Sequence, residues 1–220
     1  MKNVSIIENS FIQDALGYLR NEKTDTQLFR YYSDRVCSLL ISNVLQSKDV
    51  TSVEIQTPLI KTTGVRITND FIIIPILRAG IAMLHPTLQL LPSAKVGFAG
   101  IFRDERTALP HEYYWKMPYM SAASKILITD PMLATGGSIL HVLRKLTKQK
   151  LKDTRIVSVV SAPEGVKAIH KEFPYIHIFT AALDSYLDAQ KYIVPGLGDF
   201  GDRYFGTPTD TEAIKKGEPG

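Results

Sequence analysis

The segment from Ile126 to Ser138 has residue types in the order that suits phosphate binding. An apolar run, Ile126 to Thr129, leads into Asp130, and Thr135-Gly136-Gly137-Ser138 then opens a helical pattern. A helix N-terminus offers an anion unpaired N–H groups and the positive end of its dipole. Glycines let the main chain approach closely, hydroxyl groups donate, and a carboxylate can accept from two sugar hydroxyls. We therefore expect a sugar-phosphate site here.

The same residues also permit a plainer interpretation, a strand-to-helix turn capped by Ser or Thr. Gly136-Gly137-Ser138 does not separate the two, whereas an acidic strand end before Thr-Gly-Gly-Ser is far more specific. No Gly-Lys-Ser/Thr follows a spaced glycine, so the segment is not a Walker loop and a nucleotide triphosphatase is disfavoured.

Two arginines stand at other places where an anion could be held. Arg78 and Gly80 lie at an expected strand-to-helix turn, where a planar guanidinium suits a diphosphate. Arg103 opens a polar, aromatic stretch to Met120 that we expect to be irregular and to close over a ligand, excluding water. A solvated charge run is the competing interpretation for residues 104–106.

The glycine-dense stretch Gly196-Leu197-Gly198-Asp199-Phe200-Gly201 contains a literal G-x-G-x-x-G. Its context does not match a dinucleotide site, because we expect no following helix, strand and acidic residue. Such a loop can instead surround a small planar ligand with main-chain donors and acceptors. A ligand with the wrong hydrogen-bonding edge would then be rejected by factors of about 10⁴.

Together these segments resemble the type I phosphoribosyltransferases, and in particular their uracil-specific branch. Asp130 to Ser138 is similar to the branch's loop for phosphoribosyl pyrophosphate (PRPP), and Tyr192 to Arg203 is similar to its base-recognition segment. The resemblance runs from about Arg20 to Thr207. It implies that uracil and PRPP react to give UMP and pyrophosphate, without a covalent intermediate.

The resemblance also implies roles for individual residues. Asp130, Arg103 and Asp199 are expected to be catalytic, although Asp199 could equally support the glycine loop. The residues expected to bind PRPP are Arg78, Arg103, Asp130, Pro131, Met132, Leu133, Ala134, Thr135, Gly136, Gly137, Ser138 and Asp199. The residues expected to contact uracil, mainly through main-chain atoms, are Ile193, Gly198, Asp199 and Phe200. Many relatives have alanine in place of Phe200, whose ring could narrow the pocket.

The cofactor and the rival functions follow from the same residues. Mg²⁺ is expected to arrive on PRPP, because it prefers phosphate oxygens and water and no separate cluster of acidic and histidine residues is evident. A phosphoribosyltransferase for a purine or for orotate is disfavoured by Asp130-Pro131 and by Gly-Leu-Gly-Asp. A regulator that binds nucleic acid would need a basic patch, which the scattered Lys and Arg residues do not form.

Short apolar runs and helical patterns alternate through the centre of the chain. We expect strands at Phe71–Leu77, Ala94–Phe102, Ile126–Thr129, Ile156–Ser161 and Tyr175–Ala181. We expect helices from Gly80 (kinked or ended by Pro86), over Gly137–Lys150 and over Pro163–Phe173. This order predicts an α/β fold with a mostly parallel central sheet, flanking helices and ligands at the carboxyl ends of the strands.

The outer parts of the chain complete one expected domain over residues 1–220. Residues of about 9–46 are expected to be helical, with Asp25 or Thr26 as a cap, and Thr51–Ile60 is expected to be extended. Residues of about 182–206 are expected to form a small base-binding hood. The tail, 207–220, is polar and is expected to be flexible.

Composition excludes some broader classes of protein. Of the 220 residues 45% are hydrophobic and 22% are charged, as in ordinary globular proteins, and the net charge of +4 suits phosphate ligands. The single cysteine, Cys37, is expected to be a buried thiol, and no apolar run is long enough to cross a bilayer. We expect a cytoplasmic homodimer or larger homo-oligomer that binds neither nucleic acid nor membrane, with GTP as a candidate effector.

Overall fold

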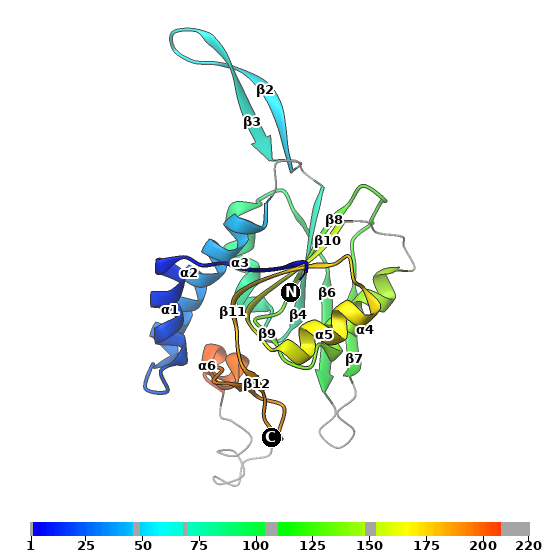
Figure 1. Ribbon diagram of the computed structural model, residues 1–220. Coiled ribbons are helices and arrows are strands. Elements are labelled where there is room, and N and C mark those ends of the chain that lie inside the picture. Colours follow the sequence, from blue (N-terminus) through cyan, green and yellow to red (C-terminus); the bar gives the residue numbers. More distant parts are fainter. Residues whose placement is uncertain (1, 46–48, 68–69, 104–109, 148–152, 208–220) are drawn as a thin grey trace.

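The computed structural model describes residues 2–45, 49–67, 70–103, 110–147 and 153–207. Its main sheet runs in the order β1-β11-β10-β8-β4-β6-β7 (Figure 1). Every neighbouring pair is parallel except β6 with β7. The strands are β1 Val4–Ile6, β4 Phe71–Leu77, β6 Phe98–Arg103, β7 Pro110–Lys116, β8 Lys125–Thr129, β10 Asp153–Ser161 and β11 His177–Leu183. The predicted α/β fold with a mostly parallel sheet is confirmed.

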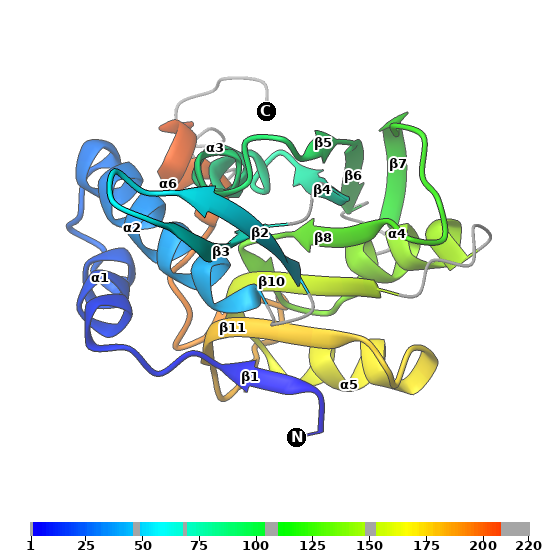
Figure 2. The same cartoon turned by 90° about the horizontal axis from the view of Figure 1, so that it is seen from above.

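Helices cover both faces of this sheet (Figure 2). They are α1 Ser10–Arg20, α2 Thr26–Val44, α3 Ile81–Leu90, α4 Gly137–Thr147, α5 Pro163–Glu172 and α6 Phe200–Phe205. One core joins α1, α2 and α3 to Leu127, whereas Ile126 and Ile128 belong to a second core with α4 and α5. Successive residues of β8 thus pack into opposite cores, which explains why its residues 126–128 are all apolar.

The strands at the centre of the sheet match the sequence predictions closely. β4 has the predicted bounds, and β8 differs from its prediction by one residue. Helices α4 and α5 begin where expected, but α3 contains Pro86 and continues to Leu90. Pro86 was expected to kink or end this helix, and it does not end it. Proline removes only its own N–H donor and crowds the preceding turn, whereas the residues after it keep their donors, so the helix continues.

The N-terminal helical region is two helices, with a break at residues 21–25. Asn9 caps α1 by accepting from Phe11 N–H at 2.8 Å, and Asp25 caps α2 by accepting from Leu28 N–H at 2.9 Å. The cap predicted at Asp25 is confirmed. A further strand, β1, was not predicted from the sequence and pairs with β11 at the sheet edge.

The predicted extended segment Thr51–Ile60 is extended as far as Gln56, and residues 57–60 form the turn of a hairpin. Strand β2, Val50–Gln56, pairs antiparallel with β3, Lys61–Ile67, and Thr57 Oγ1 accepts from Ile60 N–H at 3.0 Å in the turn. The hairpin projects from the body at the end opposite α6 (Figure 1).

The stretch from Ala94 to Met120 also differs from its prediction. Gly97 interrupts the single expected strand, leaving β5, Lys95–Val96, and β6 as separate strands. Much of the expected irregular segment is β7, which returns along β6 with a shift of register at Gly100. An edge strand with one exposed face needs no apolar run, so the polar pattern concealed it. Residues 104–109 lie outside the described residues.

The remaining expectations concern the termini and Cys37. Cys37 is fully buried, and burial raises the pKa of its thiol, as an inert structural cysteine requires. Among the described residues no helix is long and apolar enough to cross a membrane. The tail prediction falls on residues 208–220, outside the described residues, and the single-domain division stays a prediction.

Candidate active site

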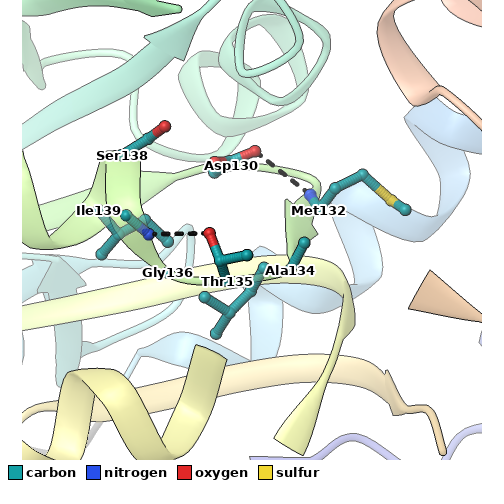
Figure 3. Close-up of a pocket in the computed structure, with 9 residues that line it drawn as sticks. Asp130, Met132, Ala134, Thr135, Gly136, Ser138 and Ile139 are labelled. Carbon is teal, nitrogen blue, oxygen red and sulfur yellow. Dashed lines mark hydrogen bonds between the residues drawn. The ribbon is translucent and has the colours of Figure 1, made fainter. Parts of the chain in front are cut away.

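A pocket lies where β8 ends and α4 begins. It has a volume of about 130 Å³ and is lined by Asp130 and by residues 132–139 (Figure 3). The chain reaches it through β9, Met132–Leu133, which pairs with β10. Pro131 does not line it, because its carbonyl accepts from Val159 and Val160 N–H, both at 3.0 Å. The remaining residues of the predicted phosphate loop are thus brought together around one cavity.

Glycines shape this loop in two different ways. Gly136 has φ of 79°, in the left-handed region that favours glycine. A Cβ on Gly137 would meet only Thr135 Oγ1, at 3.6 Å, and Gly137 itself lines the pocket. Thr135 Oγ1 accepts a weak hydrogen bond from Gly137 N–H, at 3.4 Å (Figure 3). An anion could replace that contact and take the first N–H groups of α4.

Gly165 supports the loop from α5. A Cβ there would lie 2.3 Å from Ala134 O, which is too close for any side chain. This contact explains why a glycine belongs in the first turn of α5, where the sequence gave no chemical reason for one. The close packing of α5 against Ala134 therefore fixes the position of the loop relative to the sheet.

Asp130 is the acidic residue at the floor of the pocket. Its Oδ1 accepts from Met132 N–H at 3.2 Å (Figure 3). Burial, with a smaller contribution from the negative charge of Asp199, raises the pKa of Asp130 to about 7, although the hydrogen bond from Met132 N–H lowers it. No ion pair of Asp130 is present within the described part of the chain. Its carboxylate is therefore suited to accept hydroxyl donors or to lie near a cation.

Arg78 and Gly80 form the neighbouring turn after β4. Because β4 and β8 are parallel partners, this turn meets the same edge of the sheet as Asp130. A Cβ on Gly80 would lie 2.7 Å from Thr129 O, so only glycine lets the two turns approach. Arg78 Nη2 donates to Asp202 Oδ1 at 3.1 Å, and the arginine remains largely exposed.

Arg103 is the last residue of β6 and pairs in register with Pro110. Since β6 runs parallel to β4, Arg103 also lies at the carboxyl edge of the sheet. The predicted contact of its side chain with PRPP, and the loop at 104–109, fall outside what the structure describes.

The base-recognition segment forms a short ribbon, a turn and a helix. Strand β13, Ile193–Val194, pairs antiparallel with β12, Tyr186–Leu187. Gly196 and Gly198 follow, with φ of 58° and 79°. Helix α6 then begins after Asp199, in a stretch predicted only as a loop, because six residues give too short a helical period to recognise.

Asp199 caps this helix, accepting from Asp202 N–H at 2.8 Å. Burial raises the pKa of Asp199, the charge of Asp202 raises it further, and Arg78 lowers it. The supporting role that the sequence left open is thus present. Asp199 is also close enough to Asp130 for its negative charge to raise the pKa of that carboxyl.

The other residues expected to contact uracil differ in exposure. Ile193 and Phe200 are 5% and 1% exposed. The Phe200 ring packs in the core, 5.2 Å from Phe29 and 6.0 Å from Tyr204 between ring centroids. Gly198 is exposed. The ring of Phe200 is therefore occupied in the core, and the expectation that it narrows the pocket loses its basis.

One residue of the site, Asp202, has no clear signal in the sequence. It pairs with Arg78, and only the Gly-Asp-Arg string points to it.

With this geometry established, comparison with known proteins is informative. A family model described as "Uracil phosphoribosyltransferase" matches residues 6–207. The chain belongs to the uracil phosphoribosyltransferase family. A uracil phosphoribosyltransferase of Ligilactobacillus salivarius (strain UCC118) is 42% identical over 208 residues, covering 94% of this chain and 100% of that protein. One from Streptococcus pneumoniae (strain ATCC BAA-255 / R6) is 45% identical with the same coverage.

Solved structures agree with this membership. The AQ2163 protein of Aquifex aeolicus is 32% identical with a TM-score of 0.87, covering 94% of this chain and 99% of that one. The adenine phosphoribosyltransferase of Leishmania donovani covers 100% of this chain and 98% of its own, with a TM-score of 0.59. At 13% identity this second likeness shows the type I phosphoribosyltransferase fold alone.

Proposed function

We propose that the pocket at the start of α4 holds PRPP and that the loop after β13 presents uracil to it. Family membership supports the reaction itself, transfer of a phosphoribosyl group to uracil to give UMP and pyrophosphate. The observation that carries the assignment of residues is the pocket, because its lining joins a helix N-terminus to the carboxylate of Asp130.

PRPP is held at two ends in this arrangement. The N–H groups of Gly137 and Ser138 and the hydroxyl of Thr135 take the 5′-phosphate, while Asp130 accepts from the ribose hydroxyls. Arg78 and Arg103, at the ends of β4 and β6, bind the diphosphate. Anchoring both ends holds the anomeric carbon in line with the incoming base.

In the reaction, a ring nitrogen of uracil bonds to the anomeric carbon as the carbon–oxygen bond to diphosphate breaks. The nitrogen loses its proton, and the diphosphate leaves with the electron pair. Positive charge develops on the sugar, and the carboxylate of Asp130 below it stabilises that charge. Asp199 orients the loop that carries the base, through its cap on α6.

Mg²⁺ enters this proposal as part of the substrate. Among the described residues no group of three or more His, Cys, Asp or Glu side chains could hold a metal ion. The diphosphate oxygens and water are therefore the expected ligands, and the ion neutralises charge on the leaving group.

Assembly, effector and location complete the proposal. Exposed apolar residues on the hairpin, with Leu59 94% and Ile60 69% exposed, and the exposed Tyr113 and Tyr114 support a homodimer or larger homo-oligomer. GTP as an effector and a cytoplasmic location stay predictions. Sedimentation with and without GTP would test the oligomeric state and the effect of GTP on it.

The decisive experiment is uracil-dependent release of pyrophosphate from PRPP with Mg²⁺. Cytosine, orotate and hypoxanthine are assayed in parallel. We expect pyrophosphate release with uracil and none with the other three bases. PRPP binding without turnover of any base would contradict the proposal and favour a PRPP-sensing regulator, whose retention on nucleic acid would fall with salt.

A further inference from the structure

An ion pair fastens the base-recognition loop at Gly196. The Arg20 guanidinium and the Asp184 carboxylate meet as a fork, with Nη1–Oδ2 and Nη2–Oδ1 distances of 2.8 and 2.6 Å. Arg20 Nη1 also donates to Gly196 O at 2.7 Å, and Gly196 N–H donates to Asp184 Oδ2 at 2.8 Å. Asp184 is buried. One ion pair therefore holds both main-chain polar groups of Gly196.

Arg203 fastens the next residue of the loop. It donates to Leu197 O at 2.7 Å and to Asn21 O at 2.6 Å, and it also donates to Leu19 O. Its guanidinium carbon lies 4.4 Å from the centroid of the Phe29 ring. The carbonyls of Leu19 and Asn21 are at the C-terminal end of α1, where they lack helical partners and the dipole is negative. Arg203 thus joins the end of α1 to the loop.

Gly198 follows these two fastened residues and is exposed. No hydrogen bond to its N–H or C=O group is present among the described residues. Asp199, the next residue, is fixed by its cap on α6. One free donor and one free acceptor are therefore presented between two anchored points of the main chain.

We propose that Arg20, Asp184 and Arg203 are positioning residues that fix the main chain at Gly198 and thereby determine selectivity for uracil. This inference rests on the proposed function of the loop. When a base is recognised by main-chain groups, no side chain can adjust to it. Small displacements of the N–H and C=O groups therefore decide whether the base is fully hydrogen-bonded. The three residues act from the side of the loop that faces α1.

The substitution Arg203→Lys tests this inference most directly, because lysine keeps the charge but cannot present a planar fork. Steady-state constants are measured for uracil at saturating PRPP, and PRPP binding is measured by calorimetry without a base. We expect kcat/KM for uracil to fall about tenfold or more and its ratio to that for cytosine to fall, while PRPP affinity changes less than about twofold.

A matched control is available in the same region. Arg30 donates to Tyr204 O at 2.7 Å and to Phe205 O at 3.3 Å, so it also binds main-chain carbonyls of α6, but none in the loop. We expect Arg30→Lys to leave the constants for uracil within about twofold. If Arg203→Lys does not fold, Asp184→Asn takes its place, because it keeps the shape of the side chain and removes only the charge.

The outcomes separate the inference from the function on which it rests. A lower melting temperature with unchanged constants for uracil and unchanged selectivity would show that the arginines are only structural, and would overturn the inference. Failure of the unmodified chain to use uracil would instead overturn the proposed function. A loss confined to uracil, absent in Arg30→Lys, supports the inference.

Discussion

Acidic residues at the two ends of the central sheet have opposite environments. At the amino end, before β2, Asp49 is fully buried and accepts from Arg155 at 2.7 and 3.0 Å, and it pairs with Lys125 at 3.1 Å. At the carboxyl end, Asp130 accepts one N–H, from Met132 at 3.2 Å. The protein pairs one carboxylate with two cationic side chains, whereas no such pair of the other is present among the described residues.

The comparison indicates that the amino end of the sheet contributes to stability and that the carboxyl end is suited to binding. A buried carboxylate with matched cations keeps its charge, and its removal leaves those cations unpaired. Asp130 lacks such partners in the described residues, so burial raises its pKa to about 7. The Asp49 cluster lies at the start of β4, β8 and β10 and fastens the base of the hairpin there. The Asp49 cluster and Asp130 therefore lie at opposite ends of the strands of the parallel sheet.

The largest effect on stability is expected from Asp49→Asn. Among the described residues, the substitution leaves the Arg155 side chain, 3% exposed, with the Asp153 carboxylate, 3.1 Å away, as its one charged partner. We expect a loss of about 3 kcal/mol in the free energy of unfolding, the low end for a broken buried pair. Urea denaturation measures it. A loss below about 1 kcal/mol would remove the contrast between the two ends.

The substitution Asp130→Asn should act on catalysis instead. Asparagine can still accept from Met132 N–H but brings no negative charge to the developing cation. We expect kcat/KM to fall by about 10² to 10³, while the ligand-free protein keeps or gains stability at neutral pH. Kinetics and denaturation on the same preparation test both halves. Lost activity together with lost stability would mean that Asp130 is as structural as Asp49.

Stability should also depend on pH through Asp130. Because its pKa is raised from 3.8 to about 7, the folded state holds the proton more tightly than the unfolded chain. The stabilisation of the folded state that comes from this tighter proton binding is complete below about pH 4, and it is lost as the pH rises to about 7. We expect the stability of the unmodified protein, relative to Asp130→Asn, to be lower at about pH 8 than at about pH 5. The opposite slope would contradict the raised pKa.

The smallest effect is expected from Glu54→Gln on the hairpin. Glu54 Oε1 lies 3.0 Å from Lys61 Nζ, with the two side chains 72% and 69% exposed. Solvent screens such a pair, so we expect a change below about 0.5 kcal/mol. Measured beside Asp49→Asn, it shows whether burial, and not charge removal itself, sets the cost.

The sequence predicts those parts of the fold in which one pattern dominates. β4 and residues 126–128 of β8 are uninterrupted apolar runs, and α4 opens with an unmistakable Thr-Gly-Gly-Ser start, so strand, turn and helix of the phosphate loop could all be predicted. β7 and β1 could not, because edge strands need no apolar run. The start of α2 was predicted through its cap at Asp25, but the end of α1 at Arg20 was not, because no glycine or proline marks it.

The sequence by itself determined the fold class, the phosphate loop and the family resemblance, because these depend on residues close together in the chain. Only the tertiary structure decided that Phe200 turns its ring into the core and that Arg78 pairs with Asp202. It alone brought Arg20 and Arg203 to the base loop. Such contacts join residues far apart in sequence, and no local periodicity or spacing records them.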